Sequence, residues 1–315
     1  FMKARLLHLI CIFILHFSIY AQENGTSLSD SGFKYYLASD YKKALPYYLN
    51  TIKVNEQKHN DFYHNNIIGE CYSKIGNYDT AIFYYKQALN KFIDTVNIYQ
   101  WGRNSCFSIA DCYYKLSQLD SCKTYLDKTK NWKRGHPLHG YSPAFHQNLY
   151  HLYMKYYNEK NKLDSAINVF IPWAFDEWTD NTNTYLSTEH SFENDYHCKV
   201  VDFINLLKNK YTVTEIKREL NETIKKVSCD FAFEREDSYK GEIENVYCEN
   251  TYTFFFGVKL NLRGSCSYYK KEDKSFSIKK QIKERKQYAI DYIIKSSLFY
   301  SLFESGCIPD KPLTL

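Results

Sequence analysis

Apolar and aromatic residues recur at helical spacing through the first half of the chain. Counted from Gly69, small or aromatic residues follow at offsets +3, +9, +12 and +16, namely Tyr72, Tyr78, Ala81 and Tyr85. Residues three or four positions apart share one face of a helix. The spacing therefore predicts two short helices folded back on each other around a turn at Gly76-Asn77.

The same offsets recur from three further origins, which are Gly32, Ala110 and Met154. The origins are separated by 37, 41 and 44 residues, whereas the spacing within each copy is constant. Spacing within a unit is fixed by side chains that must meet, and a longer linker costs little. Small residues at offsets 0 and +12 let two helices approach, and the aromatic residues fill the space beside them.

This pattern resembles the tetratricopeptide repeat (TPR) family, a helix-turn-helix unit of about 34 residues that stacks into a superhelix. The resemblance covers roughly residues 26–175, and it departs from the family at Met154, where a small residue is usual. It implies a concave surface, lined by the first helix of each copy, that binds a protein or peptide. The partner-binding residues implied by the family geometry are Tyr36, Asn66, Glu70, Lys74, Asp111, Tyr114, Lys115, Asn148, His151 and Asn158.

The pattern changes in the second half of the chain. Helical spacing continues over 196–207 and 214–227, and then the period becomes two. The longest alternating run, 252–262, predicts one strand that ends at a turn at Arg263-Gly264. Shorter strands are predicted at 229–233, 242–247, 265–269 and 275–278, and a last helix at 279–303.

These elements predict an α+β fold: an N-terminal α-helical TPR-like solenoid, followed by a small antiparallel β-meander packed with a C-terminal helix. The predicted domains are a TPR-like helical repeat domain at 22–175, a helical linker or capping region at 176–227, and a small α+β domain at 228–315.

Residues 1–21 have the three parts of a secretory signal peptide. A basic start at Lys3 and Arg5 precedes 15 largely apolar residues, Leu6–Tyr20, and cleavage is predicted after Ala21. The alternative is a membrane anchor, but the run is shorter than the roughly 20 residues that span a bilayer. We therefore expect a periplasmic or secreted protein with no stable membrane insertion after cleavage. The composition also resembles that of exported bacterial proteins.

Composition narrows the class of partner. The formal net charge is only +5, of which the predicted leader supplies two, so charge gives no case for nucleic acid. Aromatic residues make up 18% of the chain, with 31 Tyr, as suits a stacked helical core and a protein-contact surface. The sequence leaves the oligomeric state open.

The cysteines and histidines are candidates for disulfides and for a metal site. Cys229, Cys248 and Cys266 lie on predicted strands, where cross-strand disulfides can form, whereas the cysteines of the repeats are predicted to be free and buried. A cluster of histidines could form a metal site, or could belong to a solvated Gly/Pro loop, which we favour; its members are His136, His139, His146 and His151. We expect no metal and no cofactor.

The sequence contains no nucleophile elbow, phosphate loop or paired-histidine motif. We therefore predict that the protein is not an enzyme but an exported protein-interaction module that binds a protein or peptide partner. Two alternatives stay open: an immunity protein that neutralises a toxin in the periplasm, and an enzyme with a site in the C-terminal α+β domain.

Overall fold

The structure is a computed structural model of the 315-residue chain. It describes residues 30–54, 62–90, 99–132, 143–175, 190–239, 242–270 and 276–303. Among these, the side chains of 54, 99–101, 143–144, 190–197, 238–239, 242–243 and 263–270 are not described. The chain forms two compact units, unit 1 (Phe1–Gly140) and unit 2 (Tyr141–Leu315).

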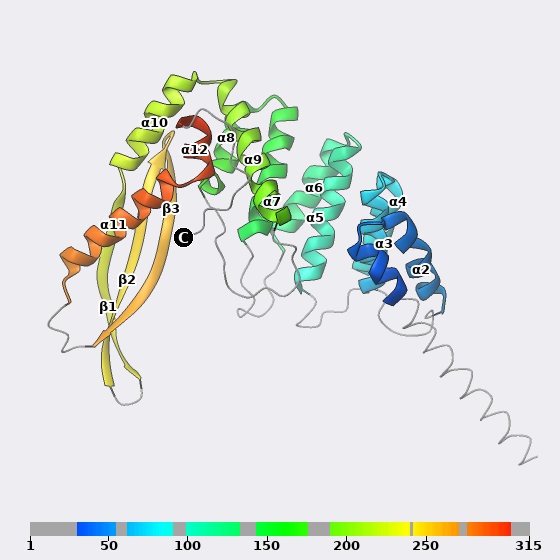
Figure 1. The fold of residues 1–315 in the computed structure, drawn as a ribbon, viewed down its shortest axis with the longest axis horizontal. Helices are drawn as coiled ribbons and strands as arrows, with labels where there is room; N and C mark the ends of the chain where they lie inside the picture. Colours follow the sequence, from blue (N-terminus) through cyan, green and yellow to red (C-terminus); the bar gives the residue numbers. More distant parts are fainter. Residues whose placement is uncertain are drawn as a thin grey trace, which may run out of the picture. The chain divides into compact units, whose positions relative to one another are not determined.

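Unit 1 consists of paired helices (Figure 1). A helix over 30–37 precedes α2 (Tyr41–Val54), and the next pairs are α3 (Phe62–Lys74) with α4 (Tyr78–Asn90) and α5 (Tyr99–Lys115) with α6 (Leu119–Lys130). In unit 2, α7 (Pro143–Glu159) and α8 (Leu163–Phe170) form a fourth pair. The predicted helical repeat is therefore confirmed in all four copies.

The turn within each copy has one left-handed residue at offset +7. These residues are Ser39, Gly76, Ser117 and Asn161, with φ of 57°, 85°, 57° and 55°. The next residue donates its backbone N–H to the carbonyl of the residue at offset +3, as Asn77 does to Tyr72 at 2.9 Å. Because this bond recurs in every copy, all four turns share one geometry.

A second regularity joins the two helices of each copy in unit 1. The tyrosines at offsets +3 and +15 pack ring against ring, with centroid separations of 5.6, 5.5 and 5.7 Å; the pairs are Tyr35–Tyr47, Tyr72–Tyr84 and Tyr113–Tyr125. The fourth copy has Tyr157 and Val169 at these offsets. Aromatic pairs of this kind contribute about 0.5–1.5 kcal/mol beyond burial, so the tyrosine content is largely structural.

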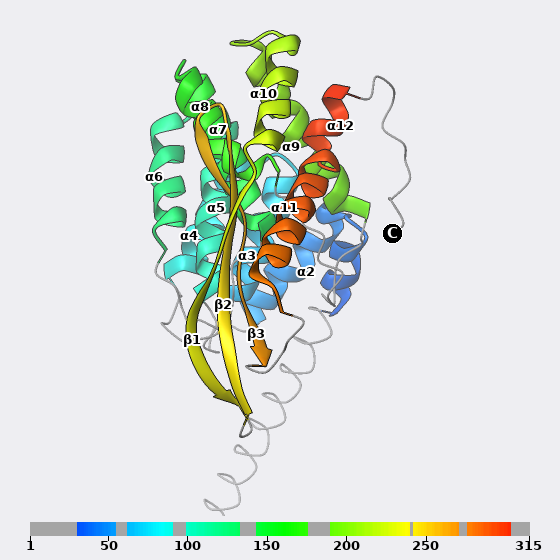
Figure 2. The same cartoon turned by 90° about the vertical axis from the view of Figure 1, so that its left-hand side faces the viewer.

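Unit 2 continues after α8 through a 3₁₀ turn (Ile171–Trp173), α9 (His190–Lys208) and α10 (Val213–Lys225). Thr212 caps α10 and forms a capping box with Glu215. Three antiparallel strands follow in the order β1 (Ser228–Tyr239), β2 (Glu242–Phe255) and β3 (Val258–Lys270). Figure 2 shows the three strands side by side.

The predicted strand over 252–262 is wrong. A two-residue turn at Phe256 and Gly257, with φ of 47° and 80°, divides it between β2 and β3. Arg263 and Gly264, predicted as a turn, lie within β3, opposite Thr251 and Asn250. The predicted strands at 229–233, 242–247 and 265–269 are parts of these three longer strands.

The hairpin also reverses which residues face inward. Near the turn, the buried side chains of β2 are Thr251, Thr253 and Phe255, while Phe254 on the opposite face is 36% exposed. After the turn, Leu260 is buried. The alternating aromatic run therefore does not mark one buried face.

The C-terminal part forms two helices, α11 (Ile278–Ile294) and α12 (Ser297–Phe303), rather than the single predicted helix 279–303. Ile278 begins α11, so the predicted strand 275–278 is also wrong, as far as residues 276–278 are described. Ser277 caps α11, which lies against β1 and β2 (Figures 1 and 2). A last helical segment covers the sheet, as predicted.

The core of unit 2 runs from the fourth repeat to α12. It joins Phe170 of α8, Phe203 of α9, Phe255 of β2, Ile293 of α11 and Leu298 of α12. The sequence groups the fourth copy with the first three, whereas the compact units place α7 and α8 with the sheet. No helix in the described ranges combines the length and apolar character needed to cross a bilayer.

Candidate partner-binding surface

Seven of the ten predicted partner-binding residues lie on the first helices of unit 1. Six of them occupy offsets +1, +4 or +5 in their copies. We call the residues at these offsets the first-helix face; they are Phe33, Tyr36, Leu37, Glu70, Ser73, Lys74, Asp111, Tyr114 and Lys115. Asn66 lies on α3 at offset −3.

Side-chain bonds connect neighbouring first helices. The Tyr36 hydroxyl donates to Glu70 Oε2 at 2.6 Å. Farther along, the Ser105 hydroxyl donates to Asn66 Oδ1 at 2.5 Å, and Cys112 Sγ lies 3.7 Å from Ser73 Oγ. The structure therefore brings Tyr36, Glu70 and Asn66 into contacts between successive copies, on the helices that the resemblance assigns to binding.

The far end of the first-helix face carries charge. Lys115 Nζ lies 3.0 Å from Asp111 Oδ2 and 5.3 Å from the ring centroid of Tyr78. Burial opposes the positive charge of Lys115, but the Asp111 carboxylate outweighs it and raises the lysine pKa. Lys74, at the same offset as Lys115, is exposed and forms no ion pair with the described residues.

The other three predicted residues, Asn148, His151 and Asn158, lie on α7 in unit 2. Asn158 is exposed, and His151 Nε2 lies 3.0 Å from Asp202 Oδ2 of α9. Burial, together with the nearby Lys155 charge, lowers the pKa of His151 to about 4 despite that carboxylate. His151 is thus a neutral, mostly buried side chain that connects two helices.

The histidine group does not form a metal site in the described residues. His146 stacks on Trp173 with a centroid separation of 5.1 Å, while His151 contacts Asp202. His136 and His139 lie outside the described residues. No group of three or more potential ligands is present in the described ranges.

Sequence reasoning missed three exposed apolar side chains on the first helices. Phe33 is 39% exposed, Leu37 64% and Tyr63 41%. Phe33 and Leu37 occupy offsets +1 and +5, the positions at which Glu70 and Lys74 were predicted, so applying the offsets to the first copy would have found them. The first-helix face is therefore apolar in the first copy and charged in the next two.

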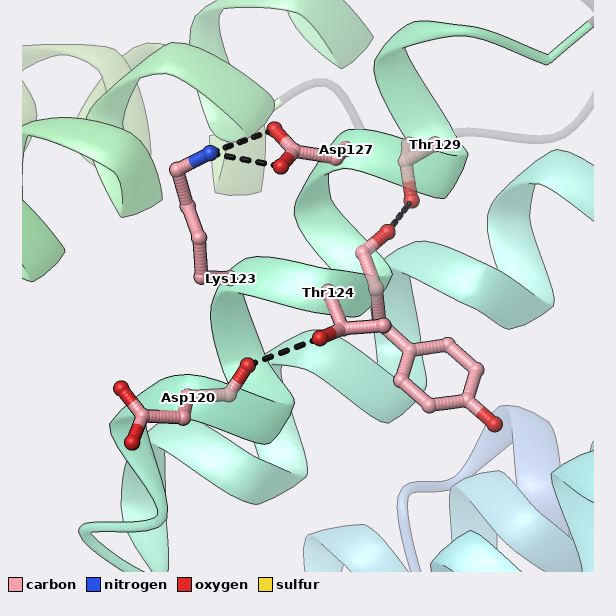
Figure 3. A network of polar contacts seen from close by, with 6 residues as sticks. Asp120, Lys123, Thr124, Asp127 and Thr129 are labelled. Atoms are coloured by element: carbon pink, nitrogen blue, oxygen red, sulfur yellow. Dashed lines mark hydrogen bonds and ion pairs between the residues drawn. The ribbon is translucent and has the colours of Figure 1, made fainter.

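On α6, the second helix of the third copy, several polar side chains bond within the helix (Figure 3). Lys123 Nζ lies 2.7 and 2.6 Å from the two carboxylate oxygens of Asp127. Thr124 and Thr129 donate to backbone carbonyls four residues earlier, at 2.9 and 2.8 Å. Such contacts stabilise a solvated helix surface.

The described cysteines of the repeats are free and buried, as predicted. Cys71, Cys106, Cys112 and Cys122 are free and buried, and burial raises their thiol pKa to about 12, 11, 11 and 12. On the sheet, Cys229 is free and buried, so the possibility that it forms a disulfide is not realised. Cys248 is disulfide-bonded, and the residue that faces it on β3 is Cys266.

No family model matches the chain, and no curated protein matches it. Solved structures are similar to parts of the chain at low identity. The APC/C hetero-tetramer Cut9–Hcn1 is 15% identical with a TM-score of 0.45, over 62% of this chain and 32% of that chain. The Podosopora anserina putative kinesin light chain with nearly identical TPR-like repeats is 11% identical with a TM-score of 0.41, over 59% and 87%. The TPR2AB domain of yeast Sti1 in its pHSP90 complex is 16% identical with a TM-score of 0.31, over 62% and 75%.

Proposed function

We propose that this protein is an exported interaction module that binds a protein or peptide partner through the first-helix face of unit 1. The observation that supports this proposal is that the face presents the exposed apolar side chains of Phe33 and Leu37 in the first copy and the exposed charge of Lys74 in the second. Apolar contact residues with polar neighbours are typical of protein interfaces.

Bonds between the first helices support a stable shape for this face. The Tyr36–Glu70 bond links the first and second copies, and the Ser105–Asn66 bond links the second and third. A surface whose side chains are already held in place loses less conformational entropy when a partner binds. The face is therefore suited to recognition of a defined segment.

The sheet supports the exported part of the proposal. Cys248 is disulfide-bonded. Disulfides persist in oxidising compartments and are rare in the cytoplasm, except in redox or catalytic roles. This agrees with the signal-like segment at residues 1–21, and the two observations together favour a periplasmic or secreted protein.

The test is cross-linking of the purified full-length chain to the envelope and secreted fractions of its own cells, with identification of the linked lysines by mass spectrometry. A single protein partner linked through Lys74 and Lys115 is the expected result. Links confined to Lys86 and Lys128, on the second helices α4 and α6, would contradict this placement of the surface.

Two matched substitutions decide between the faces. Leu37→Ser removes a 64% exposed apolar side chain from the first-helix face, and Phe83→Ser removes a 54% exposed one from α4. Neither side chain is buried, so both variants should fold. We expect capture of the partner to fall about tenfold in Leu37→Ser and to be unchanged in Phe83→Ser; equal losses would refute the proposal.

A further inference from the structure

Glu70 carries a negative charge that no cation in the described part of the chain neutralises. Its carboxylate is half-buried on α3, and its recorded side-chain partner is the neutral hydroxyl of Tyr36 at 2.6 Å. A half-buried charge usually has an opposite charge or several donors beside it. Among the described residues of unit 1, the charge of Glu70 is therefore incompletely compensated.

The equivalent residue in the next copy shows the usual arrangement. Asp111 and Lys115 occupy offsets +1 and +5, and they form an ion pair at 3.0 Å. Glu70 and Lys74 occupy the same offsets, but they form no such pair, because the Glu70 carboxylate is bonded to Tyr36 on the neighbouring helix. The same spacing thus produces a closed pair in one copy and an open carboxylate in the other.

The tyrosine that bonds to this carboxylate belongs to an aromatic cluster. Tyr36 stacks against Phe33 with a centroid separation of 6.5 Å and packs edge-on against Tyr48 at 6.5 Å. Burial raises the pKa of Tyr36 and Tyr63, and the charge of Glu70 raises both further. Both tyrosines therefore lie within the electrostatic influence of Glu70, and Tyr36 also contacts it directly.

A carboxylate without a cation, beside aromatic rings, can bind a cation through two interactions. One is an ion pair with the carboxylate, and the other is a cation–π contact with a ring face. Lys and Arg side chains have such a cation at the end of an apolar stem. The exposed side chains of Phe33 and Leu37 offer a surface on which an apolar residue next to that Lys or Arg can pack.

We infer that Glu70 is the recognition site for a lysine or arginine side chain of the partner, in a segment where an apolar residue beside the basic one packs on Phe33 and Leu37. This assignment rests on the proposed function, since it names the chemistry of the segment that the first-helix face binds. It makes Glu70 the centre of the surface rather than one contact among ten.

The test uses an array of short synthetic peptides whose sequences are chosen at random and are each known, probed with the purified full-length chain. We expect the retained peptides to be enriched in Lys or Arg next to an apolar residue. The best peptide is then titrated in solution by fluorescence anisotropy against the wild type and two variants.

Glu70→Gln removes the charge while keeping an oxygen that accepts the hydrogen bond from Tyr36, so unit 1 should retain its fold. We expect its dissociation constant to rise about tenfold and the salt dependence of binding to weaken. Asp79→Asn, which removes an exposed charge from α4, is the matched control and should leave the affinity unchanged.

The outcomes separate the two claims. Peptides retained without enrichment in basic residues, or bound equally by the wild type and Glu70→Gln, would overturn the assignment to Glu70 and leave the interaction module standing. Retention of no peptide, together with absence of a cross-linked partner, would overturn both.

Discussion

Gly69 and Tyr85 show at the scale of single residues how a repeat unit closes. A Cβ atom on Gly69 would lie 2.8 Å from Tyr85 Cδ1, and Tyr85 is only 5% exposed. The next copy has Ala110 and Leu126 at the same offsets, both fully buried. A glycine is therefore paired with a large ring, and an alanine with a smaller side chain.

Gly69→Ala should destabilise unit 1 by about 1–3 kcal/mol, because the added methyl overpacks a closed core. Urea denaturation followed by circular dichroism measures the loss. The control is the same change in the Tyr85→Leu variant, because the resulting Gly69→Ala/Tyr85→Leu protein recreates the Ala110–Leu126 pairing. Gly69→Ala should cost less free energy of unfolding in that background than in the wild type. Strict additivity of the two changes would show that the ring is not what excludes the methyl.

His151 makes the stability of unit 2 dependent on pH. Its ordinary pKa is 6.5 and its folded pKa is about 4, so below pH 6.5 the unfolded chain binds a proton that the folded chain does not. Stability should be unaffected above pH 7, fall from about pH 6.5 down to pH 4, and then level off. The groups facing the ring are Asp202 and Lys199 of α9 and Lys155 of α7.

We expect His151 to lower the free energy of unfolding by about 2 kcal/mol at pH 5 relative to pH 7.5. The difference between wild type and His151→Gln isolates it, because all other titrating groups are common to both. Urea midpoints at the two pH values provide the measurement. If the difference between the two proteins does not change with pH, His151 is not held neutral in the folded state.

At the scale of elements, Arg285 connects α11 to the sheet. Its Nε lies 2.7 Å from Glu249 Oε2, and the side chains are 17% and 0% exposed. Arg285→Met should cost about 3–5 kcal/mol, since it leaves the Glu249 carboxylate buried without its cation.

The control for this prediction is the Arg285→Met/Glu249→Met double variant. Replacing both charges by apolar groups should recover most of the loss. Thermal unfolding of the wild type, the two single variants and the double variant measures the coupling. An Arg285→Met variant as stable as the wild type would mean that Glu249 finds enough compensation elsewhere.

The repeat helices could be predicted from the sequence because Gly69 and Tyr85 meet within one short unit, so that their spacing reflects the geometry. The β2–β3 hairpin could not. Phe256 takes a left-handed conformation that a bulky residue rarely adopts, at the expected cost of strain. Its ring stacks on Tyr211, in the connection between α9 and α10, with a centroid separation of 4.2 Å, and its N–H donates to Glu219 of α10 at 2.9 Å. Both partners are distant in the sequence.

The same limit holds for the candidate site. Offsets from Gly69 and Ala110 located Glu70, Lys74 and Asp111, because each copy repeats one geometry. The Asp111–Lys115 ion pair lies within one helix, between residues four positions apart. The Glu70–Tyr36 bond instead joins two copies across a linker of variable length, so the spacing within one copy does not predict it.

For the whole molecule, the division into two units follows from where the fourth copy buries its aromatic residues. Phe170 packs against Phe203 of α9 at 5.2 Å, and Phe175 packs against Phe255 of β2 at 5.4 Å. The fourth copy also lacks the tyrosine pair found in each of the first three. Because these contacts cross long sequence distances, periodicity alone predicts four similar copies and not their division between two cores.

This division predicts that reduction of the disulfide acts on one unit only. Cys248 lies on β2 in unit 2, and the cysteines described in α3, α5 and α6 of unit 1 are free. In dithiothreitol, the free energy of opening measured by amide hydrogen exchange should fall by about 2–4 kcal/mol in β1–β3, as expected for removal of a disulfide. The values for α3–α6 should not change. Cys248→Ser should reproduce the loss without reductant, whereas replacement of the exposed, free Cys198 should have no effect. Equal loss of protection in both units would mean that they unfold as one cooperative body, since only global unfolding transmits a local change in stability to every amide.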